Sequence, residues 1–206
     1  MIGNDLLRVA ADLHTHAIGD GRFDGRADDL VARHLDGAIE AGLQIIGVTD
    51  HDDLRPGLLA QEYARAQQLP LLVVAGMEVT TNDGHLVALG LQTPLPRWNS
   101  MIETIAAARE QGALCLLPHP FFPALRERDD VDAMERINFR YGDFDVFRDD
   151  IAVVASSDAH SPADLIANPQ HTILAVRELT WLGLVESIHE RRADIVSVAR
   201  LVGNHS

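Results

Sequence analysis

The stretch LLRVAADLHTH, residues 6–16, is the part of the sequence from which the fold can first be inferred. Residues 6–11 are apolar apart from one arginine and predict a β-strand. The strand leads into a motif in which His14 and His16 are two residues apart, so an extended backbone points both imidazoles to the same side. Two imidazoles aimed at one point from a strand end are typical of a metal site, although a pair of ordinary surface histidines fits this motif equally well.

The composition is that of an ordinary globular chain, with 206 residues, 47% hydrophobic and 23% charged. Because there is no internal repeat, low-complexity segment or linker, we predict one domain over residues 1–206. No apolar run approaches the ~20 residues of a membrane span, and the first residues lack the pattern of a signal peptide. We therefore expect no membrane association and a cytoplasmic location. The single cysteine, Cys115, lies in an apolar run and is expected to be buried.

The charge of the chain limits its partners. The formal net charge of -14 repels polyanions, so we expect no docking onto long nucleic acid. A small anionic substrate remains compatible with this charge if metal ions invert it locally. All 17 basic residues are arginines, which excludes a mechanism that needs a Schiff-base lysine or a carbamylated lysine between two metals. Nothing in the sequence indicates an oligomeric state.

Strands and helices are expected to alternate along the chain. Helical spacing of apolar residues predicts helices over residues 28–42, 57–69, 100–111 and 179–192, and Ser100 and Glu103 stand in capping-box positions of the third. Short apolar runs predict further strands over residues 44–49, 71–77, 85–91, 114–117, 131–137, 151–156, 172–176 and 195–201. Because these strands are apolar on both faces, we predict a parallel sheet covered by helices, either flat and doubly wound or closed into a barrel.

Polar residues at the ends of the predicted strands favour the barrel, because barrel enzymes build their sites from the C-terminal ends of several strands. The residues in this position are His14, His16, Asp50, His51, Glu78, His119, Asp158 and His160. Each alone is a weak signal, since one histidine after a strand is more often a structural or surface residue. Burying all of these groups together without cations would be costly, and divalent metals are their usual partners.

The motifs resemble those of the PHP (polymerase and histidinol phosphatase) superfamily of metal-dependent phosphoesterases. They are DLHTH at 12–16, VTDH at 48–51, GME at 76–78, GHLVALG at 84–90, PHP at 118–120 and SDAH at 157–160, in the order of the family. The segment VDAMERIN, residues 131–138, also looks like a late strand of that family. The resemblance implies an α/β fold, a distorted (β/α)7 TIM-like barrel, and usually a site for three metal ions.

The resemblance also implies which residues would hold the ions, and mixed histidine and carboxylate ligands suit Zn, Mn or Fe. The ligands are His14, His16, Glu78 and Asp158 for the first ion, Glu78, His85 and His119 for the second, and His51, His160 and Asp20 for the third. The last ligand of the third ion could be Asp20 or Asp24, because both precede a glycine. Asp20 lies closer to the expected spacing and is favoured. We expect Asp12 and Asp50 to orient neighbouring imidazoles.

The resemblance implies a hydrolase that cleaves phosphate esters. We expect a small phosphomonoester, such as a nucleotide, a sugar phosphate or a histidinol-phosphate-like compound, attacked by a hydroxide that bridges two metal ions. Asp158, His160 or a metal-bound water could supply the proton for the leaving group. Arg22, Arg126 and Arg128 lie near the motifs and are candidates for holding phosphate.

Three alternatives stay open at this point. One is a phosphodiesterase or exonuclease that acts on short nucleotides, which the same metals would support. Another is amide or lactone hydrolysis on a similar barrel, which the absence of lysine argues against. The third is a PHP-like module without catalysis, although the chain has a candidate for every ligand. In each case we expect residues 121–150, rich in Phe and charge, to determine which substrate is accepted.

Overall fold

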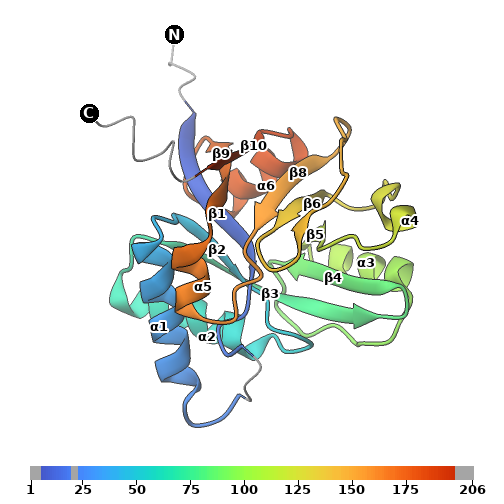
Figure 1. The fold of residues 1–206 in the computed structure, drawn as a ribbon. Helices are drawn as coiled ribbons and strands as arrows, with labels where there is room; N and C mark the ends of the chain where they lie inside the picture. The colour runs from blue at the N-terminus through green and yellow to red at the C-terminus, as the bar shows by residue number, and fades with distance from the viewer. Residues whose placement is uncertain (1–5, 20–22, 198–206) are drawn as a thin grey trace.

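The computed structural model, shown in Figure 1, describes residues 6–19 and 23–197. Its strands and helices agree with most of those expected and add two short helices, α4 and α5, and a short strand, β7. The elements are β1 (Leu7–Thr15), α1 (Ala27–Glu40), β2 (Ile45–Val48), α2 (Arg55–Gln67), β3 (Leu72–Thr81), β4 (Gly84–Leu89), α3 (Met101–Glu110), β5 (Leu114–Leu117), α4 (Pro123–Arg126), β6 (Ala133–Asn138), β7 (Gly142–Asp143), β8 (Ala152–Ser156), α5 (Pro162–Ala167), β9 (Gln170–Val176), α6 (Trp181–His189) and β10 (Ala193–Ser197).

The strands form one curled, mixed sheet in the order β10-β9-β1-β2-β3-β4-β5-β6-β7, with β8 paired to β6 (Figure 1). This is a mixed α/β fold compatible with a distorted barrel. The expectation of an all-parallel sheet is wrong, because β4 is antiparallel to both β3 and β5, and β9 is antiparallel to both β1 and β10. For β3 and β4 the reason lies in the connection: only Asn82 and Asp83 separate them, and so short a connection can only make a hairpin.

The end of β8 meets the end of β1 and brings two sequence motifs together. The backbone N–H of Asp158 donates to the carbonyl of His14 at 3.0 Å, and that of His16 donates to the carbonyl of Ala159 at 2.8 Å. These two bonds form a parallel bridge beyond the end of β8, around Thr15 and Ala159. We call this pair of bonds the β1–β8 seam. It fixes the first and the last of the expected metal ligands next to each other.

Apolar packing on both sides of the sheet holds the scaffold. Inside the curl, Leu13, Ile45 and Val74 belong to one buried cluster, and burial of each such side chain contributes about 1.5–3 kcal/mol. On the outside, α1 and α2 pack against β2 and β3 through residues such as Val31 and Ala60. These two helices and α5 pack on the outer face of the sheet, and α3 packs on the same face farther along, beside β4 and β5 (Figure 1).

Two local expectations have a direct outcome in the structure. The capping box of α3 is confirmed, since the Ser100 hydroxyl accepts from the Glu103 N–H at 3.3 Å and the Glu103 carboxylate accepts from the Ser100 N–H at 3.0 Å. Cys115 is buried in β5, as expected. Within residues 6–19 and 23–197, every helix is too short or too polar to cross a membrane.

Candidate metal centre

The site is built around Glu78, a carboxylate of β3 with no solvent exposure. Five imidazoles surround it and divide between its two oxygens. Oε2 lies 3.1 Å from His14 Nε2, 3.3 Å from His16 Nε2 and 3.1 Å from His51 Nδ1, and Oε1 lies 2.8 Å from His85 Nδ1 and 3.0 Å from His119 Nε2. A carboxylate with imidazole nitrogens grouped around each oxygen has the form of a ligand that bridges two cations.

Strand geometry explains how these side chains converge. His14 and His16 point to the same side of the end of β1, as their spacing predicts, and their Nε2 atoms are 3.2 Å apart. On β3, Glu78 and Thr80 share a face, and Thr80 pairs with His85 of the antiparallel β4. The β3–β4 hairpin therefore delivers His85 to the same face as Glu78. The unexpected antiparallel strand is thus part of how the site is assembled.

Asp158 and His160 reach the site from the segment after β8. Asp158 Oδ1 lies 3.1 Å from His16 Nε2 and 3.8 Å from His14 Nε2. The Nδ1 atom of His160 lies 2.9 Å from the carbonyl oxygen of Asp158 and 2.8 Å from Arg140 Nη1. Asp158 and His119 both have positive φ, 53° and 28°. Such values are costly for residues other than glycine and concentrate at functional sites.

The structure brings together eight of the nine ligand candidates, and all but Asp20 lie in the described residues. The atoms that could face an ion fall into overlapping groups within 4.8 Å. The groups are His14, His16 and Glu78; His51, Glu78 and His85; His14, His119 and Asp158; and His16, His51 and His160. Asp20 lies outside the described residues. Asp24 is exposed and pairs with Arg26, at 3.3 Å, just before α1.

The donor set fits divalent metal ions. Oε2 of Glu78 is buried among three imidazole nitrogens, yet it accepts a hydrogen bond from none of the described residues. Burial opposes the charge of Glu78, but the surrounding imidazoles, His14 first, hold its pKa well below the usual range. Burial likewise opposes a charge on His14, but Glu78, Glu135 and Asp158 raise its pKa well above the usual value. A buried anionic cluster of this kind calls for positive charge, which protons or metal cations can supply.

Glu135 of β6 is a functional residue that the sequence analysis missed. It is buried, and its Oε1 accepts from His14 Nδ1 at 2.9 Å. Its Oε2 accepts from the backbone N–H of His119 at 2.7 Å and from Asn138 Nδ2 at 2.9 Å. A proton on Nδ1 of His14 leaves Nε2 with its lone pair toward the cluster, which is the tautomer that a metal needs. In the sequence, the only indication of this role was that the predicted strand VDAMERIN contains one glutamate.

Asp12 and Asp50 were expected to orient imidazoles, and the structure gives them a different task. Asp12 accepts from the backbone N–H groups of His14 and Ser157, at 3.3 and 3.1 Å, and so supports both sides of the β1–β8 seam. Asp50 accepts from the N–H groups of Ala17 and Ile18, at 3.1 and 3.0 Å, and so fixes the chain after the first motif. Burial raises the pKa of each carboxyl to about 6.

Two of the three arginines expected near the site are described, and both bond elsewhere. Arg126 donates to the carbonyl of Pro120 at 3.0 Å, and Arg128 is engaged by Asp130. Arg22 lies outside the described residues. Among the described residues, Arg140, in the turn between β6 and β7, reaches the cluster, with Nη1 2.8 Å from His160 Nδ1.

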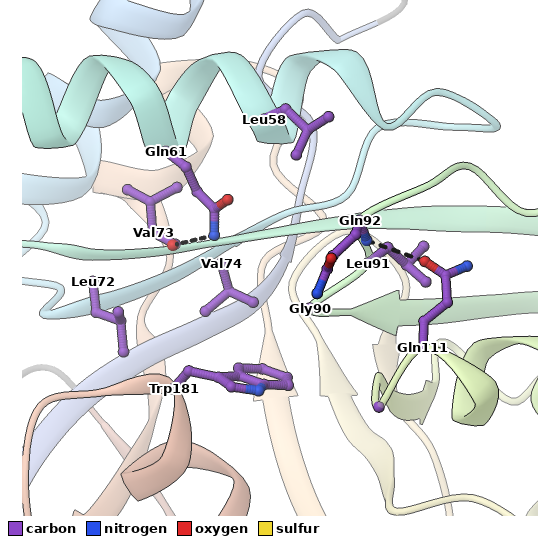
Figure 2. Close-up of a pocket in the computed structure, with 11 residues that line it drawn as sticks. Leu58, Gln61, Leu72, Val73, Val74, Gly90, Leu91, Gln92, Gln111 and Trp181 are labelled. Atoms are coloured by element: carbon purple, nitrogen blue, oxygen red, sulfur yellow. Dashed lines mark hydrogen bonds between the residues drawn. The ribbon is translucent and has the colours of Figure 1, made fainter.

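A surface cavity of about 360 Å³ lies at the other end of the barrel (Figure 2). It is lined by the beginning of β3, the end of β4 and Trp181, and contains none of the ligand candidates. Its amides are bonded within the protein: Gln61 donates to the carbonyl of Val73 at 3.1 Å, and Gln111 accepts from the N–H of Gln92 at 3.1 Å. The lining mixes amide and apolar groups and includes no histidine or carboxylate that could serve in hydrolysis.

The comparisons with known proteins agree with this geometry. No family model matches the sequence. The chain is 32% identical over 147 residues to the uncharacterized protein MJ1587 of Methanocaldococcus jannaschii, a match that covers 66% of this chain and 85% of that protein.

Two solved structures have a similar fold. One is a two-domain protein from Bacteroides vulgatus that contains a predicted PHP-like metal-dependent phosphoesterase, with TM-score 0.75 and 20% identity over 94% of this chain and 66% of that one. The other is the lesion-specific endonuclease PfuEndoQ from Pyrococcus furiosus, with TM-score 0.59 and 16% identity over 92% of this chain and 58% of that one. The chain thus spans 66% and 58% of these two chains. The resemblance to the PHP superfamily is confirmed at the level of the fold, and the chain belongs to one family with MJ1587 and has the fold of the PHP-like metal-dependent phosphoesterases.

Proposed function

We propose that the protein is a metal-dependent phosphoesterase that hydrolyses a small phosphomonoester. The observation that carries the proposal is the buried Glu78 carboxylate with imidazole nitrogens around both of its oxygens. Three divalent ions, Zn, Mn or Fe, are proposed for the site, with Asp20 as the favoured last ligand. Ions bound here would polarise a phosphate oxygen and lower the pKa of a bound water toward neutrality.

The residues of the cluster divide into a floor and a mouth. The side chains of His14, His16 and Glu78 have no exposure and form the floor. At the mouth, the side chain of His51 is 43% exposed and that of His85 is 34% exposed. A substrate phosphate must therefore approach past the exposed imidazoles, while the floor residues are protected from competing ligands.

Asp158 and His160 are the proposed catalytic residues. Both lie at the edge of the cluster, with side chains 3% and 13% exposed, and both can carry a proton. Either would be placed to give that proton to the departing alkoxide. The geometry favours neither residue as the proton donor, because the Nδ1 atom of His160 and the Oδ1 atom of Asp158 are only 3.6 Å apart.

The test is phosphate release by purified protein loaded with Mn²⁺, Zn²⁺ or Fe²⁺, measured on a broad panel of phosphomonoesters, with metal content counted in parallel. Glu78→Gln should lose bound metal and activity together. An amide has only one oxygen that can bind a cation, whereas the Glu78 carboxylate has one oxygen for each of the two groups of imidazoles. Glu62→Gln, which removes a carboxylate from the exposed face of α2, should retain both. Absence of phosphate release from every ester by fully loaded protein would refute the proposal.

Phosphodiester hydrolysis is the second candidate, favoured by the fold that the chain shares with a lesion-specific endonuclease. The net charge of -14 argues against long nucleic acid and leaves short or cyclic diesters. A higher kcat/KM for bis-p-nitrophenyl phosphate than for p-nitrophenyl phosphate would favour this candidate over the phosphatase. A PHP-like module without catalysis would instead show less than one equivalent of bound metal after gentle purification.

A further inference from the structure

The rim of the metal centre carries two aromatic rings with no place in the proposed chemistry. Phe121 follows His119 in the loop after β5, and Tyr141 lies in the turn between β6 and β7. Their ring centroids are 5.0 Å apart in an edge-to-face contact. Each ring also packs on the His119 imidazole, with centroids 5.1 Å away for Phe121 and 5.2 Å away for Tyr141. The rings therefore begin directly beside a ligand candidate.

Both rings remain half open to solvent although they pack on each other. Phe121 is 49% exposed and Tyr141 is 51% exposed. Behind them, the ring of Phe144 is 8% exposed and packs edge-to-face on Phe121 with centroids 5.6 Å apart. This second layer supports Phe121, which in turn packs on Tyr141. A fixed aromatic surface with a free face can stack a flat ring at low entropic cost.

The same turn places a positive charge at the cluster. Asn138 Oδ1 accepts from the backbone N–H groups of Arg140 and Tyr141, at 3.0 and 3.2 Å, which fixes the turn. The guanidinium of Arg140 then lies 2.8 Å from His160 Nδ1. Within the described part of the chain, no carboxylate is within ion-pairing distance of Arg140. The turn thus offers an aromatic face and a cation without an acidic partner on two successive residues.

We propose that Phe121, Tyr141 and Arg140 form the substrate-recognition surface of the site. This inference rests on the proposed phosphoesterase function and names its substrate class: a phosphomonoester whose alcohol carries a flat ring close to the phosphate. The ring stacks on Phe121 and Tyr141, and Arg140 contacts an oxygen of the phosphate. Arg140 bonds the His160 imidazole at the mouth and pairs with no described carboxylate, so its positive charge attracts the anionic end of the substrate.

Binding of two phosphonates tests the proposal without turnover. Protein loaded with Mn²⁺ is titrated calorimetrically with benzylphosphonate, which carries a ring, and with methylphosphonate, which does not. Wild-type protein should bind benzylphosphonate about 5- to 150-fold more tightly, the range expected for one stacked ring. This preference should fall to less than threefold in Phe121→Leu and Tyr141→Leu.

The matched control for the ring variants is Phe122→Leu, because Phe122 is adjacent, is 67% exposed and makes no ring contact with a described residue. It should retain the wild-type preference. Arg140→Gln should weaken both phosphonates about 10-fold or more without changing their ratio, whereas Arg33→Gln, on the exposed face of α1, should change neither. Equal metal content in all variants keeps these comparisons valid.

The outcomes separate this inference from the proposed function. A wild-type preference below threefold, or a preference that survives both ring substitutions, overturns the aromatic surface. If such a protein still releases phosphate from esters without a ring, the proposed function stands and this inference falls. Equal weakening of phosphonate binding by Arg140→Gln and Arg33→Gln overturns the role of Arg140, because it would reflect net charge alone.

Discussion

Replacement of Glu135 by glutamine is the most direct test of how the metal centre is positioned. The carboxylate accepts three hydrogen bonds, one at Oε1 from His14 and two at Oε2 from His119 and Asn138. A glutamine side chain accepts at only one oxygen and donates from its nitrogen. Whichever way the amide turns, its N–H₂ group must face at least one donor, and in one orientation it forces His14 into the wrong tautomer for a metal.

The expected loss of metal affinity follows from the number of hydrogen bonds that the substitution removes. Loss of a hydrogen bond to a charged group costs about 1.5–3 kcal/mol, which corresponds to a weakening of metal binding of roughly 10- to 150-fold. Outer partners of metal-bound histidines typically contribute 10- to 100-fold in affinity, which is the same range. We therefore expect the dissociation constant for Zn²⁺ or Mn²⁺ to rise by about 10- to 100-fold in Glu135→Gln.

The assay is competition with a chromogenic chelator, with bound metal counted by elemental analysis. Glu62→Gln is the control, because it removes the same charge from an exposed position and should bind metal like the wild type. Urea unfolding in the presence of EDTA measures separately how far the substitution destabilises the metal-free fold. A dissociation constant for Glu135→Gln within threefold of the wild-type value would refute the positioning role.

Three further predictions test other parts of the structure. Asp20→Ala should reduce the number of bound metal ions by one and Asp24→Ala should not; an unchanged count in both would remove Asp20 from the site. Burial holds the pKa of His34 at about 3, so between pH 6.5 and 3 the proton binds to the unfolded state alone. The unfolding free energy therefore decreases as the pH is lowered through this range. His34→Gln should therefore remove about 2 kcal/mol of the loss in unfolding free energy between pH 7 and 5, and equal losses in both proteins would contradict this. Gly90→Ala should destabilise the protein by about 1–3 kcal/mol more than Gly112→Ala, because both have positive φ but a Cβ at 90 would lie 2.5 Å from the indole of α6; equal denaturation midpoints would argue against that contact.

Strand ends carried most of the information about the site in the sequence. Residues such as His14, Glu78 and His119 each follow or end an apolar run, and a sheet gathers such positions at one edge. Order along the chain and residue type were therefore enough to predict that they would meet. The hairpin that brings His85 was not predicted as such, because the expected strands 71–77 and 85–91 leave residues 78–84 between them, whereas β3 continues to Thr81 and β4 begins at Gly84.

The residues that escaped prediction act through tertiary contacts. Glu135 lies in a strand whose sequence pattern fits an ordinary half-buried position, and its role follows only from its distance to His14. Arg140 and Tyr141 are an exposed pair in a turn, and nothing local shows that the turn lies over the cluster. Such roles depend on which loops face each other across the barrel, which a single sequence does not show.

The β1–β8 seam links the candidate metal centre to the contact between two strands of the curled sheet. The backbone groups that join the two strands belong to His14, His16, Asp158 and Ala159. Three of these residues would also be metal ligands, so the same residues would bind an ion and hold β1 against the end of β8. An ion shared by side chains of both strands would resist their separation, and chelation would leave only the protein's own hydrogen bonds, those of the seam and of Asp12, to do so. The amide protons of His16 and Asp158 should therefore exchange faster in EDTA than in metal-loaded protein, and equal rates would show that the seam is closed without the ion.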